Sequence, residues 1–377
     1  MAHMVPTPPL IRVALDAHVV GRRKTGNETY ILNLAEALAG LDDVAPIVYL
    51  DAGTAWPRAS HIERRDLRWR APQLRLPLEL PFRAKRDGAQ LLHVQYVAPP
   101  LSRLPVVTAI HDVSFEDLSG AFSRSTRLRL KVSIRLSALR SAAVVTLSEF
   151  SRSRIVHHYG VDPDRVVVTS LGVDSRWRRL ETDQVASRLN GLPLPERFVL
   201  TVGNLHPRKN IPRLIQALAK ARDQGAGDLH LVLAGQPAWR AEEIDVAIDK
   251  VGGGSWVHKL GYVDDDVLVA LHSAADVVAY PSLYEGFGLP VLEALACGAV
   301  VVASSTTSIP EVAGDAALLV DPMSVEGMAD GLSRAATDRQ LRVRLQKAGP
   351  ARARAFTWRR CAEETVEAYR LALRRSS

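Results

Sequence analysis

Short apolar runs alternate with helical stretches along nearly the whole chain, and this alternation constrains the fold more than any other feature. Runs of strand length lie at 11–17, 46–50, 90–96, 105–110, 142–148 and 165–170, then at 197–203, 229–235, 256–261, 276–281, 299–304 and 316–320. Strands separated by helices are typical of parallel sheets with crossover helices. We therefore predict an α/β protein with two doubly wound, Rossmann-like domains that face each other across a cleft.

The length of the chain, 377 residues, also favours two domains over one. A polar, irregular stretch at 174–196 separates the two series of strands, and we interpret it as a linker. The predicted domains are 5–174 and 197–355. The remaining segment, 356–377, is predicted to be a helix, and the N-terminal domain is a candidate surface for it to pack on.

Helix start and stop signals support this division. The segment 148–160 begins with Ser148, a good N-cap residue, and ends at Gly160, where a left-handed C-terminal glycine is expected. The segment 211–222 carries Pro212 in its first turn, a position that tolerates the missing N–H.

The composition, 47% hydrophobic and 24% charged, is that of a globular protein. Two cysteines far apart make a disulfide framework or a cysteine metal site improbable and favour a reducing, cytoplasmic location. We set the first four residues aside and expect neither a signal peptide nor a membrane-spanning helix. The net charge of +7 permits acidic partners without choosing among them.

In open parallel sheets, ligands bind beyond the carboxyl ends of the strands, so residues that follow strands are the candidates for a site. Arg208 and Lys209 follow the run 197–203 and precede a helix. Side-chain charge and helix dipole would then converge on one point, as a diphosphate requires. We rate phosphate binding above the alternative, a solvated charge pair in a loop.

Three further strand ends carry weaker signals. Gly26 precedes a predicted helix and could offer its N–H to an anion, although a plain turn is the commoner reason for such a glycine. His111 would emerge into the predicted crevice, although a single histidine is usually structural. Tyr262 and Val263 precede Asp264–Asp266, which suit a helix start, and their backbone could line a pocket.

The stretch "YPSLYEGFGLPVLEALACG" at 280–298 combines two carboxylates with a turn and a helix start. Gly286 and Gly288 permit an unusual backbone shape, and the N–H groups of 287–289 would point out of a helix that begins near Pro290. Glu285 precedes the turn, and Glu293 is placed in the first turn of the helix. Both carboxylates could border one site and accept hydrogen bonds from sugar hydroxyls.

These residues resemble a known family. "PSLYEGFGLPVLEALACG", with seven residues between its two glutamates, is similar to the E-x7-E signature of retaining glycosyltransferases of the GT-B fold in family 4. "VASSTTSIPEVAGDAALLVDP" and "VGNLHPRKN" match the same family, and "TGNETYILNLAEAL", "AIHDVSF" and "TLSEFSRSRI" resemble its N-terminal domain. The run 280–322 is the most specific of these matches.

The resemblance implies that 5–174 is the acceptor-binding domain and that 197–355 is the nucleotide-sugar-binding domain. It also implies a diphosphate site and a sugar site for the donor. Arg208 and Lys209 would bind the donor diphosphate, helped by the backbone at Gly26 and at Phe287, Gly288 and Leu289. Two departures from the family pattern affect this region: Asn204 stands where many members carry Arg, and the usual glycine pair of the first loop is Thr25-Gly26.

For the rest of the donor, the resemblance implies that Glu285 holds the transferring sugar and Glu293 the ribose of the nucleotide. His111 would contact the sugar near its anomeric carbon, and the loop at Tyr262 and Val263 would receive the base. Members transfer a hexose from a nucleotide diphosphate sugar with retention and need no metal or other cofactor. The "PRKN" variant favours GDP-mannose over a UDP-sugar, and the acceptor would be a saccharide or a lipid-linked sugar.

A basic segment at 124–140 contains five arginines and a lysine, and no acidic residue occurs between Leu118 and Glu149. Leu128, Val132, Leu136 and Leu139 recur at helical spacing, which predicts an amphipathic helix. We favour an apolar face in the core with a solvated basic face. The alternative is electrostatic docking on the inner face of an anionic membrane.

Two other functions remain open. A nucleotide-sugar epimerase shares this architecture, and an epimerised product would distinguish it from a transferase. A nucleic-acid-binding protein is suggested by charge alone, and no basic platform interleaved with aromatic residues supports it, so we expect no nucleic-acid partner.

Overall fold

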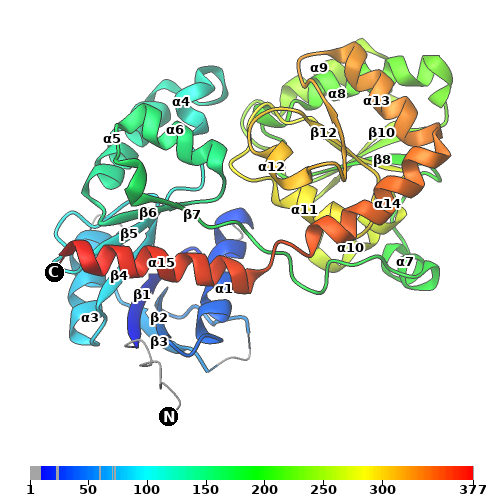
Figure 1. The fold of residues 1–377 in the computed structure, drawn as a ribbon. Coiled ribbons are helices and arrows are strands. Elements are labelled where there is room, and N and C mark those ends of the chain that lie inside the picture. The colour runs from blue at the N-terminus through cyan, green and yellow to red at the C-terminus, as the bar shows by residue number, and fades with distance from the viewer. Residues whose placement is uncertain (1–9, 23–24, 59–60, 70, 72–73, 377) are drawn as a thin grey trace. The chain divides into compact units, whose positions relative to one another are not determined.

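The structure is a computed structural model that describes residues 10–22, 25–58, 61–69, 71 and 74–376. The chain divides into two compact units (Figure 1). Unit 1 comprises the described residues of Met1–Asp117, Phe122–Gly172 and Thr357–Ser377, and unit 2 comprises Leu118–Ala121 and Val173–Phe356.

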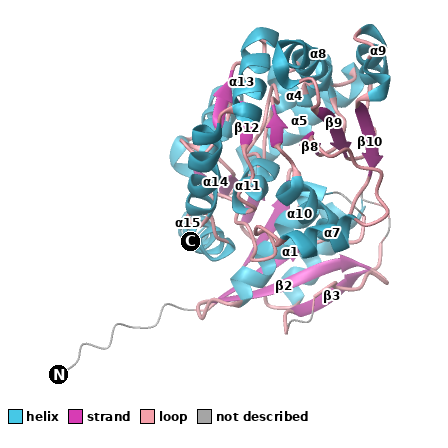
Figure 2. Cartoon of the chain, turned by 90° about the vertical axis from the view of Figure 1, so that its right-hand side faces the viewer, coloured by secondary structure: helices cyan, strands magenta, loops and turns pink. Residues whose placement is uncertain are grey.

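Unit 1 is built on a parallel sheet in the order β3-β2-β1-β4-β5-β6-β7. Its strands are β1 (Ile11–Asp16), β2 (Val44–Asp51), β3 (Glu63–Leu67), β4 (Leu91–Gln95), β5 (Val106–Ala109), β6 (Ala143–Thr146) and β7 (Val166–Val168). Figure 2 shows β2 and β3 side by side, where Ile47 pairs with Glu63. Every strand except β3 was predicted, and β3 was missed because its sequence, ERRDL, is almost entirely charged. A charged edge strand lacks the apolar pattern on which the prediction depends.

The helices of unit 1 are α1 (Thr25–Ala39), α3 (Leu80–Arg86), α4 (Ser114–Asp117), α5 (Arg124–Arg140), α6 (Glu149–Tyr159) and α15 (Trp358–Ser376). The caps predicted for α6 are confirmed: the Ser148 side chain accepts a hydrogen bond from the Ser151 N–H at 3.1 Å, and Gly160 is left-handed with φ 64°. The last helix, α15, packs on α1 and on strands β4 to β7, and it buries Val366 and Tyr369 (Figure 1).

Helix α5 has the predicted bounds, but the preferred interpretation of its apolar face is wrong. Leu128, Val132, Leu136 and Leu139 are 65%, 53%, 44% and 39% exposed, so the stripe that they form does not face the core. Helix α5 instead buries Ile134, Ser137 and Ala138. The packing face lies about half a turn from the stripe at about 100° per residue, and helical periodicity alone does not show which of the two faces is buried.

Unit 2 contains a second parallel sheet, in the order β10-β9-β8-β11-β12-β13. Its strands are β8 (Phe198–Val202), β9 (His230–Ala234), β10 (Val257–Gly261), β11 (Val277–Tyr280), β12 (Val301–Ser304) and β13 (Leu318–Val320). Its helices are α7 (Thr182–Leu189), α8 (Ile211–Ala221), α9 (Glu242–Lys250), α10 (Asp265–Ala274), α11 (Leu289–Ala296), α12 (Ile309–Ala313), α13 (Val325–Thr337) and α14 (Arg339–Ala353). All the predicted strands of this half are confirmed.

The prediction of an irregular linker at 174–196 is wrong. The segment contains α7, which packs against α10 through Val185 and Leu189 and thereby joins a hydrophobic cluster around Val269. Only Val185 and Leu189 of α7 reach that cluster, and its other residues are polar except Ala186. A short helix with so few apolar positions gives little periodic signal, because neighbouring side chains supply most of the packing.

Candidate active site

The loop after β8 is fixed by the close approach of its neighbours. Gly203 has φ 118° and Gly235, at the end of β9, has φ 157°, and a Cβ added at Gly235 would collide with the Gly203 carbonyl group. The turn Pro207–Lys209 follows and leads into α8 through Asn210, which is left-handed with φ 61°. The Asn210 side chain donates to the carbonyl groups of Pro281, at 3.1 Å, and Pro322, at 2.6 Å. This amide ties the loops after three strands together.

Arg208 and Lys209 both bind one carboxylate, that of Glu285. The Arg208 Nη1 atom lies 2.7 Å from Glu285 Oε2, and the Lys209 Nζ atom lies 2.8 Å from Glu285 Oε1. Lys209 also donates to the hydroxyl of Tyr280, the last residue of β11, and its Nζ atom lies 4.2 Å from the centre of the Tyr280 ring. Glu285 and Lys209 are each 6% exposed. The predicted phosphate cations are thus held in place by a buried carboxylate and a tyrosine.

The ionisation of Glu285 follows from these contacts. Burial by itself would raise the pKa of Glu285, but Arg208 and Lys209 outweigh burial and lower this pKa to about 2. The carboxylate therefore stays charged at neutral pH. Since each of its oxygens has two lone pairs and the cations use one on each, both oxygens can still accept from a hydroxyl group.

The turn between Glu285 and α11 presents free N–H groups. The Ser308 hydroxyl donates to the Glu285 carbonyl at 2.9 Å, and Gly288 adopts φ 103°, where a Cβ would lie 2.5 Å from Ile309 Cδ1. Within the described residues, the N–H groups of Phe287 and Gly288 donate to no acceptor. Leu289 opens α11, so its N–H also lacks a partner inside the helix. Unpaired N–H groups at the start of a helix are the donors that an anion site requires.

Glu293 has the opposite environment from Glu285. It lies in the second turn of α11, not the first as predicted, and it is 9% exposed. Its carboxyl group makes no hydrogen bond or ion pair with the described residues. Burial raises the pKa of Glu293 well above its ordinary value, Asp265 and Asp174 raise it further, and Arg176 opposes them. A buried carboxyl group that lacks a partner is one that a ligand hydroxyl can satisfy.

Glu293 should therefore make stability depend on pH. Because its pKa is raised in the fold, its favourable contribution is complete below the unfolded pKa of 4.5 and is lost as the pH rises through the folded pKa. We expect Glu293→Gln to raise the free energy of unfolding by about 1 kcal/mol or more at neutral pH, where wild type must bury a charge or hold a proton. Thermal melts across pH should show this advantage shrinking toward pH 4.5.

The exposed Glu196, substituted as Glu196→Gln, is the matched control and should show no such trend. A Glu293→Gln variant no more stable than wild type at neutral pH would contradict the assigned environment of this carboxyl group.

The remaining predicted residues of unit 2 follow strands β8 and β10 of the same parallel sheet. Asn204 is exposed in the loop after β8. Tyr262 and Val263 follow β10, and the Tyr262 side chain is 47% exposed. Asp264 is the N-cap of α10 and Asp265 lies in its first turn, as predicted.

The two predicted residues of unit 1 differ from each other. Gly26 is the second residue of α1 rather than the residue before it, and a Cβ there would meet no atom within 4 Å. His111 follows β5 and is buried, with the rings of Tyr30 and Tyr96 at 4.6 and 5.3 Å. Its Nε2 atom has no hydrogen-bond partner among the described residues, and burial lowers the pKa of His111 to about 4. It is therefore neutral at neutral pH.

The prediction missed three residues that shape the site. Tyr280 binds Lys209, Asn210 ties three loops together, and Ser308 anchors the Glu285 carbonyl. Tyr280 lies near the end of a predicted strand, so the sequence could have identified it as a candidate site residue. Asn210 and Ser308 act on backbone carbonyl groups, which no sequence pattern identifies.

Two features are absent from the described residues. They contain no group of three or more His, Cys, Asp or Glu side chains placed to hold a metal ion. They also contain no helix that is long and apolar enough to cross a membrane.

Comparison with known proteins shows the family. Residues 184–352 match the family described as glycosyl transferases group 1, and residues 25–177 match glycosyltransferase family 4. The O-antigen chain mannosyltransferase B of Escherichia coli is 33% identical over 266 residues, which is 70% of each chain. The chain belongs to the family 4 glycosyltransferases.

Other relatives agree with this assignment. The MMP alpha-(1->4)-mannosyltransferase of Mycolicibacterium hassiacum is 33% identical over 62% of this chain and 54% of its own length. Among solved structures, the sucrose-phosphate synthase of Thermosynechococcus elongatus has a TM-score of 0.77 at 23% identity, covering 96% of this chain and 98% of its own. Anabaena HepE in complex with UDP-glucose has a TM-score of 0.76 at 21% identity, covering 96% and 99%. These neighbours share the GT-B fold, as predicted.

Proposed function

We propose that this glycosyltransferase is a retaining enzyme that moves a hexose, with mannose favoured, from a nucleotide diphosphate sugar to a saccharide or lipid-linked acceptor. The observation that carries the proposal is the cluster in which Arg208 and Lys209 share the buried carboxylate of Glu285. The preference for mannose, and for GDP-mannose as donor, rests on the "PRKN" sequence and on relatives that are named mannosyltransferases.

The cluster carries one net positive charge, because two cations face one carboxylate. A diphosphate adds negative charge, which Arg208 and Lys209 can bind together with the free N–H groups of Phe287 and Gly288. Breaking the bond between the sugar and the phosphate increases the charge on the leaving group. Cations and N–H donors that are already in place stabilise that charge without reorganising, which is commonly a large catalytic contribution.

The carboxyl groups supply the sugar contacts. Glu285 is charged and accepts hydrogen bonds from hydroxyls of the transferring hexose, while Glu293 binds the ribose. His111 is neutral, so it can donate or accept one hydrogen bond at the sugar. The base of the nucleotide is received by the loop at Tyr262 and Val263.

No residue of the site is placed as a committed nucleophile, so the mechanism that we propose is front-side attack. The acceptor oxygen forms a bond to the anomeric carbon on the face that the phosphate leaves, and the configuration is retained. The leaving phosphate oxygen takes the acceptor's proton. No metal enters this scheme, because Arg208, Lys209 and the free N–H groups take the part that a cation would play.

Thermal-shift measurements test the donor class. GDP and GDP-mannose should raise the melting temperature more than UDP and UDP-glucose. At a concentration 100 times its dissociation constant, a ligand adds about 2.7 kcal/mol to the free energy of unfolding. Guanosine is the matched control, because it has the base and ribose without the diphosphate. A shift as large with guanosine as with GDP would contradict the role of the cation cluster.

The alternatives from the sequence are not favoured. An epimerase would convert the donor without an acceptor, and the matching relatives are transferases. A mass-spectrometric assay of donor and acceptor together separates these reactions, since only a transferase lengthens the acceptor.

A further inference from the structure

We propose that α5 docks unit 1 on the surface of an anionic lipid bilayer. One face of α5 carries an exposed apolar stripe formed by Leu128, Val132, Leu136 and Leu139. Apolar side chains that line up along a helix and stay in solvent mark an interaction surface. The proposal does not depend on the reaction proposed above.

Arginines border the stripe on both sides. At about 100° per residue, Arg124 and Arg135 lie on one flank of the stripe, and Arg129 and Arg140 lie on the other. All four are exposed, and none makes an ion pair or hydrogen bond with the described residues. Their charge is therefore available to a partner.

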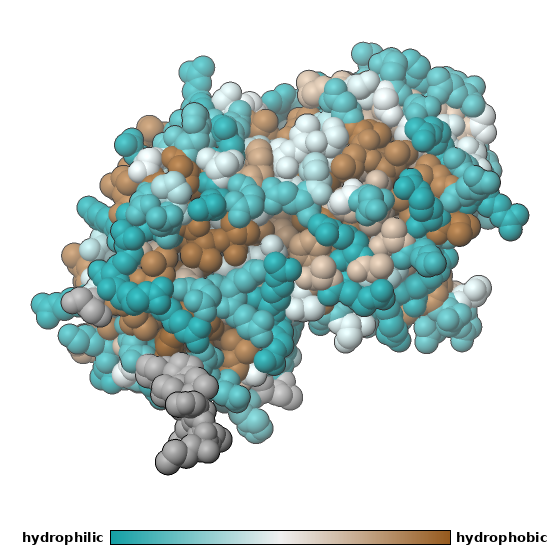
Figure 3. Space-filling view, viewed as in Figure 1, coloured by the Kyte–Doolittle hydropathy of each residue, from teal (hydrophilic) through white to brown (hydrophobic). Residues whose placement is uncertain are grey.

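The other cations of α5 serve the fold. Lys131 forms an ion pair with Glu116 at 2.5 Å, and the Arg127 Nε atom donates to the Phe115 carbonyl at 2.9 Å. The Ser137 hydroxyl accepts a hydrogen bond from the Ala98 N–H at 2.9 Å. One side of α5 is thus fixed to the unit, and the opposite side carries the stripe and its arginines. Figure 3 shows hydrophobic and hydrophilic side chains next to one another on unit 1.

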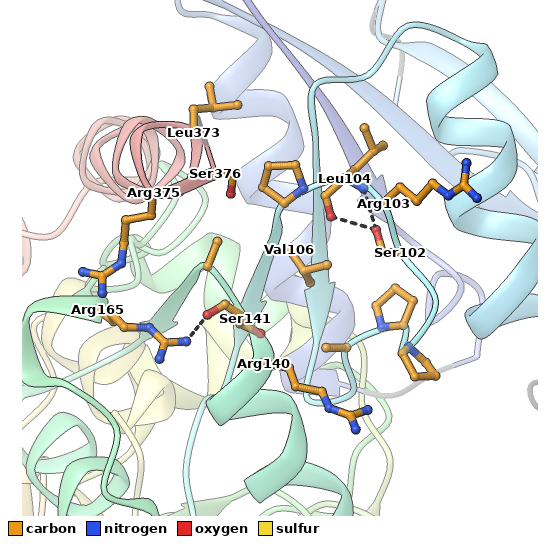
Figure 4. Close-up of a pocket in the computed structure, with 15 residues that line it drawn as sticks. Ser102, Arg103, Leu104, Val106, Arg140, Ser141, Arg165, Leu373, Arg375 and Ser376 are labelled. Carbon is orange, nitrogen blue, oxygen red and sulfur yellow. Dashed lines mark hydrogen bonds between the residues drawn. The ribbon is translucent and has the colours of Figure 1, made fainter.

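A cavity of about 730 Å³ adjoins the end of α5 (Figure 4). Four arginines and no acidic residue are among its lining residues, the arginines being Arg103, Arg140, Arg165 and Arg375. Arg165 donates to the Leu139 carbonyl at 3.1 Å, and Arg375 lies 3.4 Å from Asp162. Arg103 and Arg140 form no such pair within the described chain. Arg140 therefore belongs both to the border of the stripe and to a basic cavity suited to a phosphate group.

Charge decides which partner fits. A second copy of this chain would bring its own arginines against these in a symmetric contact, and like charges repel. An anionic bilayer offers phosphates to the arginines and acyl chains to the leucines. A helix of 17 residues spans about 25 Å, which is long enough for the whole stripe to lie flat in the interface.

Vesicle flotation tests the proposal with the full chain. Wild type should float with vesicles of phosphatidylcholine mixed with phosphatidylglycerol, and far less with phosphatidylcholine alone. Arg129→Gln together with Arg135→Gln should weaken binding to the mixed vesicles by about 25-fold. Each arginine near an anionic surface increases the affinity about fivefold. Leu128→Gln together with Leu136→Gln should weaken it by at least about tenfold.

Matched controls come from unit 2. Arg344→Gln with Lys347→Gln removes the same charge from α14, and Val246→Gln with Val343→Gln alters two residues that are 66% and 60% exposed. Both controls should float like wild type. Every variant should melt like wild type, because the altered side chains are exposed.

Two outcomes overturn the proposal. In one, wild type floats with neither kind of vesicle, or the control variants lose as much binding as the α5 variants. In the other, sedimentation shows a dimer that Leu128→Gln with Leu136→Gln dissociates while vesicles capture nothing, which would assign the stripe to a second copy of the chain.

Discussion

Replacing Lys209 with Ala should lower kcat by about 10²–10³-fold, the usual effect of removing one preorganised donor to a developing negative charge. The Lys209 Nζ atom is held by Glu285 at 2.8 Å and by the Tyr280 hydroxyl, so it stands ready before any donor binds. The KM for the acceptor should change far less, because the proposed contact is to the leaving group. Steady-state kinetics with GDP-mannose as the donor measures both quantities.

Lys220→Ala is the matched control for this variant. Lys220 lies on α8 and its Nζ atom is 2.8 Å from Glu326, but the side chain is 41% exposed and far less confined. Its loss should leave turnover unchanged. A Lys209→Ala enzyme that folds, as shown by its melting curve, and turns over like wild type would remove Lys209 from the proposed mechanism.

The second large effect is expected from Glu285→Gln, which should lower the free energy of unfolding. The substitution leaves the buried Lys209 and the partly buried Arg208 without a counter-charge, and breaking a buried ion pair in this way costs about 3 kcal/mol. The pKa of Glu285 leads to a similar figure: a fall from 4.5 to about 2 corresponds to about 3 kcal/mol.

The lowered pKa of Glu285 also determines how this difference in stability changes with pH. A carboxyl group with a lowered pKa stabilises the fold above its unfolded pKa, and the contribution is lost as the pH falls through the folded value. The difference between wild type and Glu285→Gln should therefore be full at neutral pH and disappear between pH 4.5 and about 2. Urea unfolding at a series of pH values measures it. Glu326→Gln, at an exposed ion pair, should show no measurable change.

The candidate site of unit 2 could be proposed from the sequence because its charged residues lie in two short segments. Arg208 and Lys209 are neighbours, and Glu285 stands three residues before the left-handed Gly288. The rule that ligands bind beyond the carboxyl ends of parallel strands brings these two segments to one edge. The sequence did not reveal that Glu285 binds both cations, because the pairing joins residues about 76 positions apart.

The two carboxyl groups show the same limit of prediction from sequence. Glu285 and Glu293 look alike in the sequence, yet one has a lowered pKa and the other a raised pKa. Ionisation depends on which charges and how much water surround a group, and both are set by the packing. The chemical type of each residue was predictable, while its protonation was not.

By itself, the sequence determined the two parallel sheets, the helix caps and the family, because each is carried by short-range periodicity or by a local motif. Tertiary structure decided which face of α5 is buried, that α7 joins unit 2, and how Asn210 ties three loops together. A helical repeat specifies that a face is apolar. Only the packing of residues distant in the chain decides whether that face meets the core or the solvent.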